Sequence, residues 1–157
     1  MYKKKLKILG TIIAFIFCFV FYYLYSEFPC FLTSIFSPVN KDNWEYTKIL
    51  FSSIIFSGVT QKITVFIKKI KINNICFSNF VGAISSIPIF IILFLLFYNL
   101  IKININIIFY LMFITIIIAE IISYIIMGKK DLKLENKTIF FVIFTYVIYL
   151  LVTYFLK

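Results

Sequence analysis

The chain has no histidine and no arginine, and it has only four glycines and three cysteines among its 157 residues. Without histidine it cannot build a Ser-His-Asp or Cys-His catalytic pair, or the histidine-based zinc site of a hydrolase. Its isolated glycines form no glycine-rich phosphate loop. Cys18, Cys30 and Cys76 lack the paired spacing of metal ligands or of a disulfide framework. We therefore expect no catalytic residue, no metal ion and no cofactor.

Acidic residues are also scarce, because six of them accompany 16 lysines and give a net charge of +10. A protein that binds nucleic acid normally gathers its basic residues, arginine above all, on one soluble face. Here the lysines lie between long apolar runs instead. The charge is therefore a topology signal, and we expect the lipid bilayer, not nucleic acid, to be the partner.

Apolar residues make up 63% of the chain, whereas a soluble domain has about 45–50%. Each of five runs, at residues 8–25, 49–67, 80–101, 107–127 and 139–156, is long enough to cross the bilayer as a helix. Helices are required because lipid cannot satisfy free backbone groups. The sequence predicts an all-α polytopic membrane protein, with a single transmembrane domain over residues 1–157 that forms a bundle of five transmembrane helices.

Lysine placement predicts the orientation, with the N-terminus in the cytoplasm and the C-terminus outside. In that orientation eleven lysines are cytoplasmic and four are external, as the positive-inside rule requires. The first run is longer than the ~7–15-residue core of a signal peptide and should remain as an uncleaved anchor. A four-span alternative places the most polar run, residues 49–67, in the membrane interface.

The segment before the second run carries most of the polar side chains expected outside. Asn40 is the predicted N-cap of the helix that follows. Trp44, the only tryptophan, is expected at the headgroup level with its N–H hydrated. Glu45 and Lys48 share one helix face at i,i+3. Asn40, Trp44, Glu45 and Lys48 form the candidate functional motif of the outer face.

This segment resembles a family of small bacterial multi-pass membrane proteins that is defined as a domain of unknown function. The family motif is Pro-Val-Asn-Glu-Ser-x-Trp-Glu-His-x-Lys, and residues 38–40, 44, 45 and 48 match it. Lys41, Asp42 and Tyr46 replace the family Glu, Ser and His. The resemblance implies a bacterial plasma-membrane protein with a shared outer-face function, and the lost histidine removes any role that it has in the family.

Two ionisable residues fall inside apolar runs, at comparable depths below the cytoplasmic surface. Lys62 lies five residues before Ile67, and Glu120 lies seven residues before Met127. A charge at such a depth costs about 2.5–3.5 kcal/mol, which favours pairing. We predict an intramembrane pair between Lys62 and Glu120. The alternatives are a Lys62 that snorkels to the interface and a protonated Glu120 bonded to a neighbouring hydroxyl.

Small and hydroxyl residues indicate where helices pack. Ser53, Ser57, Thr60 and Thr64 fall within one sector of the second run. They either line a hydrated path or, as we favour, bond across to neighbouring helices. The spacing Gly82-x-x-x-Ser86 is typical of a close helix contact, and Pro88 predicts a kink in the third run.

The function that the sequence favours is a non-enzymatic recognition or assembly role that uses the outer segment and the second run, with a second copy or another membrane protein as partner. The alternative is a small transporter or channel component that uses Lys62 and Glu120. An intramembrane enzyme comes third, because carboxylates, lysines and tyrosines are the only acid–base groups. A hydrated cavity joining Glu45 to Glu120 would favour transport, and a dry bundle would favour assembly.

Overall fold

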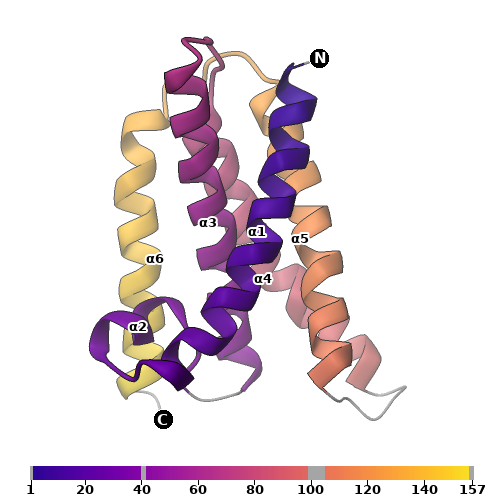
Figure 1. The fold of residues 1–157 in the computed structure, drawn as a ribbon, viewed down its shortest axis with the longest axis vertical. Helices are drawn as coiled ribbons and strands as arrows, with labels where there is room; N and C mark the ends of the chain where they lie inside the picture. The colour runs from indigo at the N-terminus through magenta and orange to yellow at the C-terminus, as the bar shows by residue number, and fades with distance from the viewer. Residues whose placement is uncertain (1, 40–41, 99–104, 156–157) are drawn as a thin grey trace.

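The computed structural model describes residues 2–39, 42–98 and 105–155, which form a bundle of helices (Figure 1). The helices are α1 (Tyr2–Glu27), α2 (Phe31–Phe36), α3 (Asn43–Ile67), α4 (Ile75–Tyr98), α5 (Ile105–Met127) and α6 (Glu135–Phe155). All except the short α2 are long and apolar enough to cross a membrane. The predicted all-α bundle with five membrane-spanning helices is confirmed.

The two chain termini lie at opposite ends of the bundle (Figure 1). One end carries the N-terminus together with the α3–α4 and α5–α6 connections, and we call it the basic end. Its lysines are Lys3, Lys4, Lys5, Lys68, Lys69, Lys71, Lys129, Lys130, Lys133 and Lys137. The other end carries α2 and the C-terminus. An odd number of spans places the termini on opposite sides of a bilayer.

Helix α3 lies at the centre of the bundle, where it packs against α1 and α4. More than half of its apolar window, 56%, is buried inside the protein, against 33% or less in the other four long helices. The four-span alternative for this run is therefore wrong. The polar side chains of this run face protein rather than lipid, and this explains how the most polar of the five runs can lie within the bundle.

The long helices begin before their apolar runs do. Helix α1 starts at Tyr2 rather than at residue 8, and α3 starts at Asn43 rather than at residue 49. The N-cap of α3 is Asp42, whose side chain accepts a hydrogen bond from the Glu45 amide at 2.9 Å. The prediction of Asn40 as N-cap is therefore wrong, because the helix begins two residues later. Asn40 itself lies outside the described residues.

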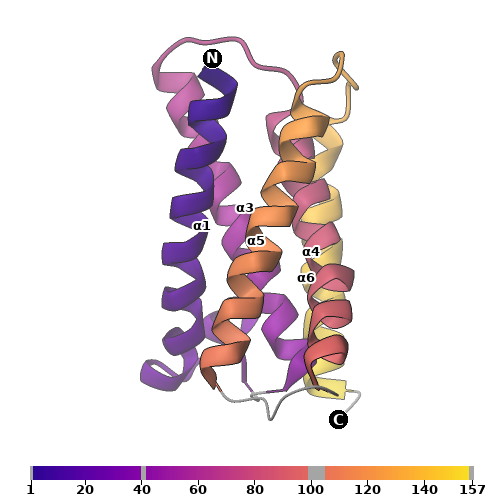
Figure 2. The same cartoon turned by 90° about the vertical axis from the view of Figure 1, so that its right-hand side faces the viewer.

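Helices α4 and α5 pack against each other as antiparallel neighbours, as the short connection between them predicts, and α1 contacts α5 (Figure 2). Helix α6 is peripheral, because it packs mainly on α4 and reaches the centre through aromatic side chains. Phe51 of α3 contacts the rings of both Tyr146 and Tyr149, with centroids 5.2 and 5.8 Å away. The core is thus four helices with a fifth attached at its side.

Apolar side chains fill the bundle at the level of the helix midpoints. Ala14, Ile54, Ala83 and Ile116 contribute from four different helices, and all of them are fully buried. Some hydroxyls near this level bond to their own helix, as when Thr115 donates to the Leu111 carbonyl at 2.7 Å. This packed layer separates the polar groups at the two ends of the bundle.

Candidate functional site

Glu45 and Lys48 form a buried ion pair at the end opposite the N-terminus. Lys48 Nζ lies 2.6 Å from Glu45 Oε2, and both side chains are 0% exposed. Glu45 also accepts hydrogen bonds from the Val39 amide at 3.1 Å and from the Thr153 hydroxyl at 2.6 Å. Lys48 donates to the Ser34 carbonyl at 2.9 Å. These five residues, which we call the Lys48 cluster, tie the α1–α3 connection and α6 to α3.

Three tyrosines of α6 extend this attachment. Their hydroxyls donate to hydroxyls on α3 and α2, at 3.1 Å from Tyr149 to Thr47, 3.1 Å from Tyr146 to Ser52 and 2.7 Å from Tyr154 to Ser34. Each bond gives a tyrosine hydroxyl a partner that lipid cannot supply. The polar face of α3 therefore holds the peripheral helix in place.

Trp44 packs under α6 instead of pointing its N–H to the headgroups. Its ring lies 5.3 Å from that of Tyr149, and its buried Nε1 has no hydrogen-bond partner among the described residues. The ring lines an apolar groove of about 420 Å³ between α4 and α6. The expectation of a hydrated Trp44 N–H is wrong, because α6 covers the indole.

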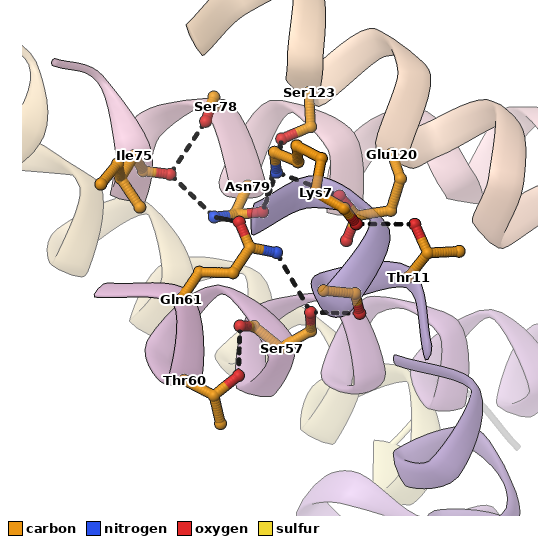
Figure 3. A network of polar contacts seen from close by, with 11 residues as sticks. Lys7, Thr11, Ser57, Thr60, Gln61, Ile75, Ser78, Asn79, Glu120 and Ser123 are labelled. Carbon is orange, nitrogen blue, oxygen red and sulfur yellow. Dashed lines mark hydrogen bonds and ion pairs between the residues drawn. The ribbon is translucent and has the colours of Figure 1, made fainter. Parts of the chain in front are cut away.

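A second buried ion pair lies toward the basic end, where Lys7 of α1 meets Glu120 of α5 (Figure 3). Lys7 Nζ is 3.0 Å from Glu120 Oε2, and it also donates to Asn79 Oδ1 and to Ser123 Oγ, each at 2.6 Å. The three protons of the ammonium group therefore have three acceptors. Asn79 continues the network to Gln61 of α3, at 3.4 Å.

This set, which we call the Lys7 cluster, draws side chains from four helices. Its members are Lys7 of α1, Ser57 and Gln61 of α3, Asn79 of α4, and Glu120 and Ser123 of α5. Ser57 donates to the Gly10 carbonyl at 2.7 Å, which closes the network on α1. Gly10 has no side chain at this crossing, where a Cβ would meet Gln61. The helix contact and the polar network thus depend on each other.

Glu120 uses only one of its two carboxylate oxygens in the network. The side chain is 3% exposed, and the buried Oε1 has no hydrogen-bond partner in the part of the chain that the structure describes. The residue lines an open cleft of about 350 Å³ between α1 and α5, with Lys4, Thr11 and Tyr124 among the other lining residues. A buried carboxylate oxygen without a donor is costly. Glu120 therefore brings an unused acceptor to the wall of the cleft.

The predicted pair between Lys62 and Glu120 is wrong. Lys62 bonds to Glu135 at the start of α6, with Nζ 3.3 Å from Oε2, and its side chain is 50% exposed. Glu120 pairs with Lys7 instead. The depths were comparable, but α1 and α4 are the main neighbours of α3, and α5 is only a minor one. Lys7 is available because α1 begins at Tyr2, which brings this lysine inside the first helix.

The hydroxyls of the α3 sector bond mostly within their own helix. Thr60 donates to the Ser57 carbonyl and Thr64 to the Thr60 carbonyl, at 2.7 and 2.8 Å. Ser53 donates to the Ile49 carbonyl at 2.7 Å. Ser57 alone among these four has a bond to another helix, that to Gly10. The favoured interpretation, bonds across to neighbouring helices, therefore holds for one residue in four.

Lys7, Gln61 and Asn79 are site residues that the sequence pattern does not single out. Lys7 follows Lys3, Lys4 and Lys5 and therefore looks like part of the same topology signal, although the apolar run begins directly after it. Asn79 lies just before residue 80, the predicted start of the third span. The one signal for Lys7 is its position on the helix, because it lies on the same face as the buried residues of α1 and so points inward. The sequence alone does not show which face of α1 is buried, since that depends on which helices pack against it.

The described residues contain no group of three or more side chains suited to hold a metal ion. The three thiols are unpaired: Cys18 is buried, Cys30 is exposed and Cys76 is half-buried. The fold therefore defines a helical multi-pass membrane protein with two buried ion pairs. Comparisons with protein-family models, with curated proteins and with solved structures found no match for this chain.

Proposed function

We propose that this chain is a non-enzymatic membrane protein with a recognition or assembly role that is carried by the α1–α3 connection and α3. The observation that carries the proposal is an exposed apolar segment that is held by hydrogen bonds to a buried ion pair. Phe28, Phe31 and Leu32 are 63–69% exposed at the end opposite the N-terminus. Directly after them in the chain, Ser34 and Val39 are bonded to the buried Lys48–Glu45 pair. An exposed apolar group held in this way suits a partner surface.

In this proposal the motif residues Glu45 and Lys48 support the binding surface and do not form it, which differs from the role that the sequence suggested. Glu45 and Lys48 have no exposed surface, so a partner does not contact them. They hold the neighbouring segment in one conformation, and that segment meets the partner. The resemblance to the bacterial family, a cytoplasmic basic end and location in a bacterial plasma membrane belong to the same proposal. The lysine bias supports the orientation.

Cys30 provides a direct test, because it lies beside Phe31 and is exposed. In a protein with Cys18→Ala and Cys76→Ala, a short bismaleimide added to proteoliposomes or native membranes should link Cys30 to a second copy or to one defined membrane protein. The matched control carries Cys30→Ala and Ile125→Cys, which places an exposed thiol on α5 near the basic end. It should give no specific product. If Cys30 is labelled but only the monomer is recovered, the proposal is wrong.

The transport alternative has less support, because packed apolar residues separate the Lys48 and Lys7 clusters. Ala14, Ile54, Ala83 and Ile116 lie between them and are fully buried. Ion flux into liposomes should therefore be the same with wild-type protein, with Glu120→Gln and without protein. Flux that appears with wild type and falls with Glu120→Gln would transfer the support to a transporter or channel component.

A further inference from the structure

The cleft between α1 and α5 has the features of a binding site that the recognition role does not use. Its volume of about 350 Å³ lies within the usual range of ligand pockets, about 300–1,000 Å³. Glu120 lines it, and the buried Oε1 of this residue has no donor among the described residues. Lys7 cannot supply one, because its three protons already go to Glu120 Oε2, Asn79 and Ser123. A ligand in the cleft that brings an N–H or O–H would satisfy this oxygen.

The mouth of the cleft has the opposite character. Lys4 is exposed there, three residues before Lys7 in α1, which corresponds to about 4.5 Å along the helix axis. Lys4 therefore offers a positive charge to an anionic group nearer the membrane surface. Along the normal of the membrane, the site presents a cation first and a hydrogen-bond acceptor one turn deeper.

The walls of the cleft are apolar. Ile8 of α1 faces Ile117 and Ile121 of α5, with Tyr124 near the mouth. The side chains of Ile8, Ile117 and Ile121 are about half exposed, at 46–55%, so the cleft opens to the surrounding lipid. One hydrocarbon chain can lie along these isoleucines and gain the usual benefit of apolar contact. The lining thus fits an amphiphile rather than a free ion.

We propose that this cleft binds a lysophospholipid, a single-chain lipid with a phosphate and a free hydroxyl on the adjacent glycerol carbon. The phosphate binds Lys4 at the mouth. The free hydroxyl donates its proton to Glu120 Oε1, and the acyl chain lies between α1 and α5. The Lys7–Glu120 pair stays intact, because the ligand bonds to the carboxylate oxygen of Glu120 that Lys7 does not contact.

The arrangement discriminates against the abundant diacyl phospholipids. Esterification of the second glycerol hydroxyl removes the only donor that lies inward of the phosphate, and ester oxygens only accept hydrogen bonds. The hydroxyls of a glycerol headgroup lie outward of the phosphate, away from Glu120. A free inorganic phosphate has no chain for the isoleucine walls. Selectivity for the hydroxyl is therefore the signature of this site.

The test uses purified full-length protein in detergent and native mass spectrometry. The probe is oleoyl lysophosphatidic acid, compared with an analogue whose free glycerol hydroxyl is methylated. The two have the same charge and chain, and they differ in the one donor. Because a hydrogen bond to a charged group is lost, the methylated lipid should bind about tenfold more weakly or worse. Equal binding of the two lipids would overturn the proposal.

Three variants test the rest of the site. Lys4→Gln should weaken binding, whereas Lys5→Gln, which removes an exposed charge outside the cleft lining, should not. Ile121→Trp should fill the cleft and abolish binding without loss of thermal stability, because Ile121 is 55% exposed. Equal losses with Lys4→Gln and Lys5→Gln, or full binding by Ile121→Trp, would show general surface attraction and refute the site.

Discussion

The two buried ion pairs among the described residues differ in how they are built. Glu45 and Lys48 lie one turn apart on α3. Lys7 and Glu120 are 113 residues apart and join α1 to α5. All oxygens of Glu45 are in use, whereas Glu120 keeps one without a donor. The Glu45–Lys48 pair within one helix has partners for both carboxylate oxygens and serves to hold neighbouring segments in place. The Lys7–Glu120 pair between two helices leaves one carboxylate oxygen available to a ligand.

The largest effect should come from the saturated pair. Glu45→Ala leaves a buried ammonium on Lys48 and removes the acceptor of the Val39 amide and of Thr153. We expect a loss of about 3–5 kcal/mol in the free energy of unfolding. Titration with a denaturing detergent, followed by Trp44 fluorescence, measures it. The control Glu27→Ala changes an exposed residue and should cost less than ~0.5 kcal/mol. If Glu45→Ala lowered the free energy of unfolding by an equally small amount, the Glu45–Lys48 pair would not be the structural anchor that we describe.

Replacing both members of each pair should separate the two clusters further. Lys7→Met with Glu120→Met should recover most of the loss seen with Lys7→Met alone, because Ser123 already lies 3.4 Å from Asn79 and can remain its partner. Glu45→Met with Lys48→Met should stay about 2 kcal/mol below wild type or lower, because the Val39 amide and the Ser34 carbonyl lose their partners. Equal recovery in both double variants would contradict this account.

Close packing around the Lys7 cluster gives an intermediate effect. A Cβ at Gly82 would lie 2.9 Å from the Ala119 carbonyl oxygen of α5, whereas a Cβ at Gly10 would meet the Gln61 side chain. Backbone cannot move as easily as a side chain, so Gly82→Ala should cost about 1–3 kcal/mol. Gly10→Ala should be rescued by Gln61→Ala, while Gly82→Ala should not. Thermal unfolding measures the rescue. If Gln61→Ala rescued both glycine variants, the contact between Gly82 and the α5 backbone would not be the cause of the loss in Gly82→Ala.

The smallest effect concerns Cys30 near the Lys48 cluster. Hydrogen bonding to Thr33, 3.5 Å away, lowers the pKa of the Cys30 thiol. Because the thiolate is the reactive form, Thr33→Val should raise that pKa and slow maleimide labelling severalfold near pH 7, with the difference vanishing at alkaline pH. An impermeant maleimide should reach Cys30 from outside intact cells. Protection until the cells are opened would reverse the proposed orientation.

Much of the fold could be predicted from the sequence, because the lengths of the apolar runs and of the connections between them are local properties. The five spans and the antiparallel neighbours α4 and α5 followed from them. The adjacency of Glu45 and Lys48 followed from helical spacing alone. Their complete burial did not follow, because it depends on where α6 and α2 pack.

The partner of Glu120 could not be predicted for a related reason. Depth in the membrane limits which helix residues can meet, but it does not say which helices are neighbours. Lys62 and Lys7 both reach the level of Glu120 within one or two turns, and only α1 presents its lysine to α5. The N-cap error had a simpler origin, since two polar residues near the start of α3 could cap it and Asp42 does.

The separation of Lys7 from Glu120 has a consequence for biogenesis. At ~5–20 residues per second, synthesis of the 113 residues between them takes roughly 6–23 s. Throughout that interval the ammonium of Lys7 lacks its carboxylate, and a long lysine side chain can place such a charge among the lipid headgroups. In the proposed orientation, Lys7 counts with Lys3, Lys4 and Lys5 toward the cytoplasmic lysine bias. The ion pair that joins the first helix to α5 can form only once Glu120 has been synthesised.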